Sequence, residues 1–232
     1  EFQGSSWQGF GFAVQTYQKR AWPVLHWLHQ LAHRHHRCIP VRLVKGAYWD
    51  SEIKRAQEQG LKGYPVFTRK TATDVSYLAC ARFLMSNTDS LYPQLATHNA
   101  MTLAWINEIG RGRDYELQRL HGMAGSLYQA LADCFDDVPP VRVYAPVGNH
   151  QELLPYLVRR LLENGSNSSF INQLTDKQTD LDELVENPCR RIEATDCRPH
   201  RHIPLPVDLY GDERRNAIGW DLSDPDVVNE ME

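Results

Sequence analysis

The stretch PVRLVKGAYWDSEIKRAQ, residues 40–57, carries the clearest indication of fold class in this chain. It opens with a short run, 40–45, whose β-branched residues favour a strand. A glycine and two aromatic residues follow, and residues 49–59 then show the charged pattern of an exposed helix. The stretch therefore predicts a strand that passes through a short loop into a helix.

The same alternation continues on both sides. Residues 20–34 place Trp22, Leu25, Leu28 and Ala32 near the 3.6-residue period of a helix. Connections of this length join parallel strands, so we expect a parallel α/β sheet with right-handed crossovers. Strands are expected at 9–15, 40–45, 93–98, 115–120 and 141–146, and the other helices at 49–59, 71–85, 99–109, 124–134 and 150–163.

Two features favour a (β/α)8 barrel over a doubly wound sheet. The segment Gly9-Phe10-Gly11 lacks the third glycine of a dinucleotide-binding loop. Several strands also end in polar residues, as at the carboxyl face where barrel active sites lie. These strand-end residues are Gln15, Lys45, His98 and Tyr144.

The number of strands predicts an incomplete barrel. A closed barrel needs eight βα units, and we expect about five here, with the missing units before the first residue. The chain opens with Glu1-Phe2 and no initiator methionine. We therefore expect an internal piece of a longer protein, with an open sheet edge and part of its core uncovered.

Composition and charge exclude several classes of protein. Of the 232 residues 42% are hydrophobic, which is enough for a core. A net charge of -4 argues against nucleic-acid binding through a basic surface. No apolar run reaches the ~18 residues of a membrane span, and no signal-peptide pattern opens the chain. The five cysteines form no C-x-x-C pair, which fits a reducing compartment and gives no zinc or disulfide framework.

The segment Arg42–Trp49 is the first candidate site. It leaves a strand with two cations, a glycine that allows close backbone approach, and two adjacent aromatics. Aromatics at this position could cover a flat cofactor ring, and Arg42 could hydrogen-bond it. The alternative interpretation is a loop with Lys45 solvated and Trp49 capping the core. The spacing alone leaves both interpretations open.

The helix around residues 156–163 is the second candidate. Tyr156, Arg159, Arg160 and Glu163 share one face, and paired guanidinium groups suit bidentate capture of a carboxylate. A solvated charged face is the alternative. Leucines 157, 161 and 162 mark the opposite side of the helix as core.

Histidines give a weaker signal. Thr97-His98-Asn99 ends a strand and opens a helix, so His98 could act as an acid or base or contact a cofactor, and Asn99 is a good N-cap. His26, His29 and His33 share a helix face. They lack a nearby carboxylate or cysteine, so we interpret them as a solvated helix end and expect no metal site.

Eight motifs together resemble the proline dehydrogenase domain of the bifunctional proline-utilisation flavoproteins. They run in order over residues 10–173, and several are long. The motifs are QTYQKR (15–20), RLVKGAYWDSEIKRAQ (42–57), GYPVFTRK (63–70), DVSYLACA (74–81), ATHNA (96–100), LHGM (120–123), YAPVG (144–148) and YLVRRLLENGSNSSF (156–170).

The resemblance implies a fold, a reaction and a set of site residues. The fold is a (β/α)8 barrel that binds FAD noncovalently, and the reaction oxidises L-proline to 1-pyrroline-5-carboxylate by hydride transfer to flavin N5, with electrons passed to ubiquinone. Arg159 and Arg160 match the pair that binds the proline carboxylate. Tyr48, Leu120 and Tyr144 match residues that pack on the substrate ring, and Arg42 matches the contact to flavin N5. The other positions implied to line FAD or support its contacts are Gln15, Val44, Gly46, Trp49, Thr68, Lys70, Thr97, His98, Asn99, Gln118 and Glu163.

The resemblance also implies domains, location and partners. Residues 1–173 are expected to form the C-terminal part of the barrel. Residues 174–232 are expected to be a partly helical linker toward a glutamate-semialdehyde dehydrogenase domain that uses NAD. The parent is expected in the cytoplasm, peripherally at the membrane surface when it reduces ubiquinone. A homodimer is one expected assembly, and DNA is a partner only if the parent carries an N-terminal DNA-binding domain.

The chain lacks two residues of the family site, and two other functions remain as alternatives to proline dehydrogenase. The family site also uses a lysine and an aspartate from strands that would precede residue 1, so we expect this polypeptide alone to bind FAD weakly or not at all and to have little activity. One alternative is a different barrel enzyme that uses Lys45 as a Schiff-base lysine. The other is a non-catalytic assembly fragment, in which residues 205–232 make the contacts.

Overall fold

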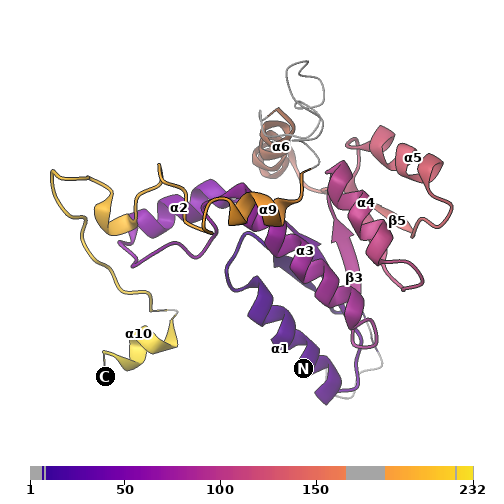
Figure 1. Ribbon diagram of the computed structural model, residues 1–232, viewed down its shortest axis with the longest axis horizontal. Helices are drawn as coiled ribbons and strands as arrows, with labels where there is room; N and C mark the ends of the chain where they lie inside the picture. Colours follow the sequence, from indigo (N-terminus) through magenta and orange to yellow (C-terminus); the bar gives the residue numbers. More distant parts are fainter. Residues whose placement is uncertain (1–6, 8, 166–185, 223, 232) are drawn as a thin grey trace.

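A five-stranded parallel sheet organises the chain (Figure 1). The structure is a computed structural model that describes residues 7, 9–165, 186–222 and 224–231. The strands are ordered along the sheet as along the sequence, and each pairs in parallel with the next. They are β1 (Phe12–Gln15), β2 (Ile39–Val44), β3 (Leu91–Ala96), β4 (Glu116–Leu120) and β5 (Val141–Tyr144).

A helix or a pair of helices follows each strand, as the alternation predicts. The six predicted helices are confirmed to within two residues at each end, and the five strands to within three. The helices are α1 (Ala21–Arg34), α2 (Trp49–Glu58), α3 (Lys70–Ser86), α4 (Ala100–Ile109), α5 (Gly125–Cys134), α6 (His150–Gly165), α9 (Pro188–Glu193) and α10 (Pro225–Asn229), with a short 3-10 turn η1 (Pro206–Asp208).

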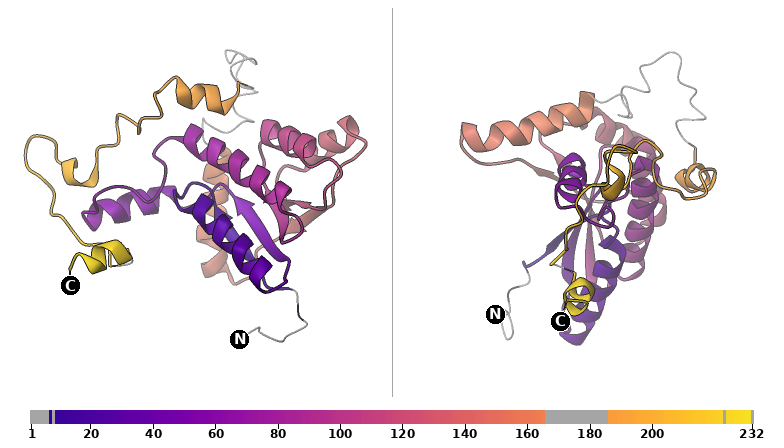
Figure 2. Two further views of the ribbon diagram at one scale, coloured as in Figure 1. Left: turned by 60° about the horizontal axis from the view of Figure 1, so that its bottom comes forward. Right: turned by 90° about the vertical axis from the view of Figure 1, so that its left-hand side faces the viewer.

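The main core lies between the sheet and the helices α1, α3, α4 and α5 (Figures 1 and 2). Each strand turns every second side chain toward these helices, as Val41 and Leu43 of β2 do. The helix α1 contributes Leu25, Leu28 and Ala32, as predicted. Its Trp22 is instead 45% exposed, because the buried stripe passes through Ala21, and the indole lies against His26 and Phe83 near the surface.

The described strands form an open sheet in which each strand lies beside the next one in the sequence and the core helices cover one face, as in a segment of a (β/α)8 barrel with about five βα units. The edge strand β5 shows the consequence expected for an unclosed sheet. Val141 is 37% exposed and Val143 45% exposed, so this end of the apolar face is poorly covered. In the described part of the chain, no helix is both long and apolar enough to cross a membrane.

The tail after residue 186 packs back on the chain (Figure 2). The helix α9 contacts α3, and η1 contacts α2. The tail also binds the 59–70 loop: the Tyr64 hydroxyl donates to the Pro204 carbonyl at 2.7 Å, and the Gly219 amide donates to the Gly60 carbonyl at 3.0 Å. These contacts give residues 204–219 an intramolecular role. The domain boundary at 173/174 lies outside the described residues and stays a prediction.

Gly60 is expected to be essential for this docking. It ends α2 in the left-handed region, with φ of +60°, and a Cβ there would overlap the carbonyl oxygen of Ala217. We expect Gly60→Ala to lower the free energy of unfolding by about 1–2 kcal/mol through backbone strain alone. Faster proteolysis of the tail should accompany this loss. Gly63→Ala is the matched control, because a Cβ at Gly63 meets open space. Equal stability of the two variants in urea denaturation would contradict the left-handed conformation of Gly60, and a tail cut no faster in Gly60→Ala than in Gly63→Ala would contradict the docked tail.

Candidate active site

The side of the sheet opposite the helices is polar. Because strand side chains alternate, the positions between the core residues of each strand point to this side. We call it the polar face, defined by Gln15, Arg42, Gln94, Glu116, Gln118 and Arg142, and it also carries Val44, Leu120 and Tyr144.

Arg42 and Tyr144 meet on the polar face from opposite parts of the sheet. The guanidinium carbon of Arg42 lies 4.2 Å from the centroid of the Tyr144 ring, which is a cation–π contact. The Nε of Arg42 is buried and has no hydrogen-bond partner among the described residues. A buried guanidinium N–H without an acceptor is costly. The site therefore offers a donor suited to an acceptor atom of a bound molecule.

The second contact joins α6 to the start of α2. Arg159 donates from Nη2 to the Tyr48 hydroxyl at 3.0 Å, and its guanidinium carbon lies 4.5 Å from the centroid of the Tyr48 ring. The Arg159 Nε is buried without a partner among the described residues. Arg160, also half-buried, lies over the Tyr156 ring at 5.3 Å. The arginine face of α6 thus contacts the loop after β2.

The opposite side of α6 differs from the sequence expectation. Leu157, predicted as core, is 43% exposed, as are Val158 at 43% and Leu154 at 50%. Helix α6 follows the poorly covered edge strand β5, and its described residues Leu154 and Leu157 lack the packing that the pattern predicts for Leu157. The side chains of Leu161, Leu162 and Glu163 lie outside the described residues, although the backbone of α6 includes them.

The loop after β3 brings His98 next to Leu120 and Arg160. The Leu120 amide donates to His98 Nε2 at 3.4 Å. Burial, and then the nearby charges of Arg160 and Arg119, hold the pKa of His98 below its usual value. A neutral imidazole therefore faces the arginine helix at neutral pH.

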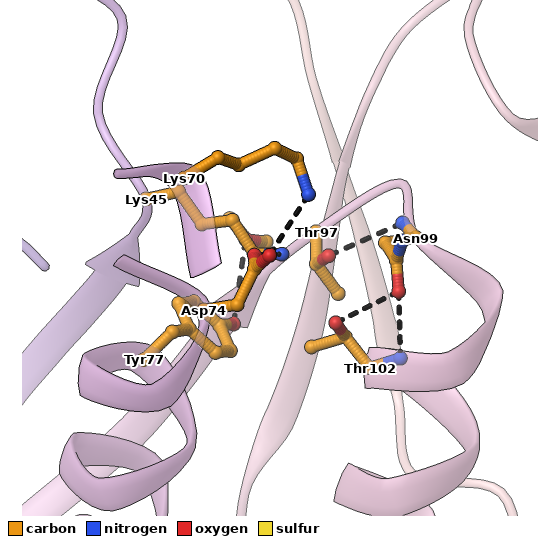
Figure 3. Close-up of polar contacts among 8 residues, drawn as sticks. Lys45, Lys70, Asp74, Tyr77, Thr97, Asn99 and Thr102 are labelled. Carbon is orange, nitrogen blue, oxygen red and sulfur yellow. Dashed lines mark hydrogen bonds and ion pairs between the residues drawn. The ribbon is translucent and has the colours of Figure 1, made fainter. Parts of the chain in front are cut away.

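Thr97 and Asn99 are used by the fold (Figure 3). Asn99 caps α4, as predicted, by accepting from the Thr102 amide at 2.9 Å, and Thr97 Oγ1 accepts from the Asn99 amide at 3.2 Å. The buried Tyr128 hydroxyl lies 2.8 Å from the Thr97 carbonyl and 3.1 Å from that of Gln118. These bonds fix the carboxyl ends of β3 and β4 relative to each other.

Asp74 joins two lysines at the carboxyl end of β2 (Figure 3). Its carboxylate lies 2.5 Å from Lys45 Nζ and 2.8 Å from Lys70 Nζ. An adjacent carboxylate favours the charged ammonium form of Lys45. A Schiff-base lysine needs the neutral amine, so this ion pair disfavours the alternative enzyme that uses Lys45.

The sequence-predicted residues Gly46, Trp49 and Thr68 lie in the segment between β2 and α3, which includes α2. Trp49 donates from Nε1 to the Phe67 carbonyl at 2.8 Å and packs on a small second core. Thr68 Oγ1 accepts from the His200 amide at 2.9 Å, which ties this residue to the tail. Gly46 has φ of +121°, and a Cβ there would meet the Tyr17 ring. This backbone approach needs glycine.

Sequence reasoning missed Asp74, Glu116 and Arg142. Glu116 is 2% exposed, yet it lies two residues before Gln118 on the same face of a strand, and that spacing was the available signal. Asp74 lies one turn after Lys70 in α3, a spacing that predicts an ion pair. The described residues include no group of three or more His, Cys, Asp or Glu placed to hold a metal.

Asp74 is expected to make stability depend on pH. Burial alone would raise the pKa of Asp74, but Lys45 and Lys70 outweigh it, and the pKa lies below the usual value. The stabilisation is therefore complete above the unfolded pKa of about 3.9 and is lost as pH falls through the folded value. We expect Asp74→Asn to lower the free energy of unfolding by about 1–3 kcal/mol at pH 7. The fall of that free energy toward acid pH should also become less steep. Urea denaturation from pH 7 downward measures this. Asp212→Asn, at an exposed tail position, should keep the full acid limb. A wild-type slope in Asp74→Asn would contradict the assignment.

A comparison with known families decides the relationship. The model of a family described as proline dehydrogenase matches residues 1–173. The chain belongs to the proline dehydrogenase family. Among its relatives is the bifunctional protein PutA of Klebsiella aerogenes, which is 51% identical over 232 residues covering 94% of this chain. The match covers 18% of that relative, so this chain spans about a fifth of its length.

Solved structures of PutA proteins support the same family relationship. A mutant of proline utilization A (PutA) from Bradyrhizobium japonicum has a TM-score of 0.90 and 50% identity, covering 98% of this chain and 23% of that chain. A PutA structure described as having proline bound in remote sites has a TM-score of 0.89, 50% identity and the same coverage. The resemblance read from the motifs is therefore confirmed, together with the barrel-type proline dehydrogenase fold.

Proposed function

We propose that this chain supplies much of the substrate and flavin site of an FAD-dependent proline dehydrogenase, which oxidises L-proline to 1-pyrroline-5-carboxylate. Two contacts carry the proposal: Arg159 pairs with Tyr48, and Arg42 stacks on Tyr144. Two buried guanidinium Nε atoms there have no acceptor among the described residues. Both aromatic rings stand beside these cations at the carboxyl ends of their strands.

The chemistry of proline fits these groups. Proline is a small zwitterion, so its binding needs cations for the carboxylate and an apolar or aromatic surface for the ring. Arg159 and Arg160 supply the cations, and charge-assisted bonds to a carboxylate are the strong ones. Tyr48, Tyr144 and Leu120 supply the surface. Fixing the ring in this way orients its C5 hydrogen toward the hydride acceptor.

The donors on the polar face suit a flavin. When bound, FAD supplies the acceptor for the hydride that leaves C5 of proline, and it passes electrons to ubiquinone. Arg42 is the residue proposed to face the N5 edge of the flavin. Its buried Nε is a hydrogen-bond donor with no partner among the described residues, and its positive charge would stabilise the negative charge of the reduced cofactor. The ring ammonium of zwitterionic proline would first release a proton to solvent, and the lone pair left on the nitrogen would then support loss of the hydride from C5. The other proposed FAD-lining residues are Gln15, Val44, Gly46, Trp49, Thr68, Lys70, Thr97, His98, Asn99, Gln118 and Glu163.

The wider proposal concerns the longer relatives. We propose a cytoplasmic enzyme that meets the membrane surface peripherally when it reduces ubiquinone, with a homodimer as its assembly. NAD would serve a separate glutamate-semialdehyde dehydrogenase domain, and DNA binding would require an additional N-terminal domain. The match to bifunctional PutA proteins supports this proposal.

Steady-state turnover tests the proposed function. The full-length parent protein that contains this chain is loaded with FAD, and we call it the FAD-loaded protein. It is mixed with L-proline and a soluble quinone, and quinone reduction is followed together with formation of the cyclic imine product. We expect both to depend on L-proline and to be much slower with D-proline, because the carboxylate clamp fixes which face of the ring meets the acceptor. Loaded protein that shows no proline-dependent quinone reduction would overturn the proposal.

A further inference from the structure

We propose that Glu116 is a positioning residue that holds the edge strand β5 through Arg142 and so keeps Tyr144 against Arg42. The hydrogen bonds of Glu116 join it to Arg142, Gln118 and Gln94, which are not among the residues proposed to touch the substrate ring. It acts on them through the geometry of β5. The part of the proposal that concerns proline rests on the proposed function, whereas the part that concerns β5 does not.

Glu116 is a buried carboxylate with unusually complete hydrogen bonding. Arg142 binds it with two parallel bonds, from Nε at 2.8 Å and from Nη2 at 2.7 Å. Gln118 Nε2 donates to it at 2.7 Å and Gln94 Nε2 at 3.0 Å. Burial alone would raise the pKa of Glu116, but the bonds from Arg142 and Gln118 outweigh it and lower the pKa. The carboxylate is therefore ionised at neutral pH and joins three adjacent strands.

Apart from its backbone pairing with β4, the strand β5 has few buried apolar contacts. It is a four-residue edge strand paired only with β4 in the described sheet, and its core-facing residues Val141 and Val143 are exposed by more than a third. Strands with few buried apolar contacts open locally at low cost. The bidentate pair between Glu116 and Arg142 ties such a strand to the buried centre of the sheet.

The pairing register of β4 and β5 links the position of Arg142 to that of Tyr144 in the candidate site. Arg142 pairs with Gln118 and Tyr144 with Leu120, so Arg142 and Tyr144 lie two residues apart on the same face of β5. The Tyr144 ring in turn stacks on Arg42 at 4.2 Å. A strand displaced at Arg142 must move Tyr144 away from Arg42.

Hydrogen exchange tests the first step in the full chain. We expect Glu116→Gln and Arg142→Gln each to speed amide exchange in a peptide spanning 141–146 by about tenfold. The double variant should add little, because both changes remove the same pair. Glu108→Gln is the control, since Glu108 in the last turn of α4 forms an exposed ion pair with Arg111, which follows the helix. Exchange at 141–146 that matches wild type in Arg142→Gln, whose side chain is on the surface, would overturn the proposal.

Kinetics in the FAD-loaded protein separate positioning from general stability. We expect Glu116→Gln to raise KM for L-proline by about fivefold or more with a smaller change in kcat, because the ring-packing surface is displaced. In a Tyr144→Leu background the same substitution should leave KM unchanged, since Tyr144 transmits the effect. An equal rise in both backgrounds would show a merely structural role and overturn the proposal. Loaded wild-type protein without proline turnover would instead count against the proposed function, and the exchange result would decide the role of Glu116.

Discussion

Replacing Arg160 with methionine in the FAD-loaded, full-length parent protein is expected to raise KM for L-proline by about 10- to 150-fold. The substitution keeps the length of the side chain and removes a charge-assisted bond to the substrate carboxylate, which is worth about 1.5–3 kcal/mol. The change in kcat should be smaller, because the carboxylate is bound in the ground state and the transition state alike. Initial rates over a range of proline concentrations measure both constants.

Two companion variants sharpen this prediction. Arg160→Lys keeps the positive charge but loses the planar guanidinium group that can bind a carboxylate with two bonds. Its KM should therefore lie between those of the wild type and Arg160→Met. Arg55→Met removes a guanidinium from the exposed face of α2 and should leave KM unchanged. If Arg160→Met behaved like Arg55→Met, the arginines of α6 would not bind the carboxylate.

Replacing Arg42 with methionine is expected to lower kcat by about 100- to 1,000-fold, the usual cost of losing one preorganised electrostatic group at the reacting centre. Arg42 lies on the polar face with its Nε buried, and its charge is the one proposed to stabilise the reduced cofactor. The midpoint potential of the bound flavin should fall at the same time, because the reduced form loses a cationic neighbour. Stopped-flow reduction by proline and a redox titration measure these two effects.

The controls for Arg42 separate charge from packing. Arg42→Lys should restore part of kcat and most of the midpoint potential. Arg82→Met, at an exposed position of α3, should change neither. A normal midpoint potential in Arg42→Met would place Arg42 away from the flavin, even if the loss of the Tyr144 contact slowed the enzyme.

The fold was largely predictable because its signals are local. Short β-branched runs, helical periodicity and connection lengths predicted every strand of the sheet, and Asn99 was predicted as the N-cap of α4. The exposure of Leu157 was not predicted. Helical periodicity indicates which side of a helix is apolar, but it does not indicate whether another element packs on that side. The same limit applies to Trp22, which a neighbouring alanine displaces from the buried stripe.

The candidate site was only partly predictable, because its contacts join distant parts of the chain. Arg159 and Tyr48 are 111 residues apart, and Thr68 is held by a tail residue 132 positions later. The bond between Glu116 and Arg142 depends on the register of β4 and β5, which no local pattern specifies. Family resemblance named Tyr48, Arg159 and Arg160, whereas the supporting residues Asp74, Glu116 and Arg142 became visible only in the structure.

The central claim is that this chain supplies, within its full-length parent, residues that place a flavin where proline can reduce it. Anaerobic addition of L-proline to the purified FAD-loaded parent protein, followed by visible absorption, tests this claim most directly. We predict that the flavin bands bleach in proportion to the proline added, and that Arg160→Met shifts the titration to higher proline concentration. Bound flavin that keeps its bands with excess L-proline, yet bleaches with a chemical reductant, would contradict the account.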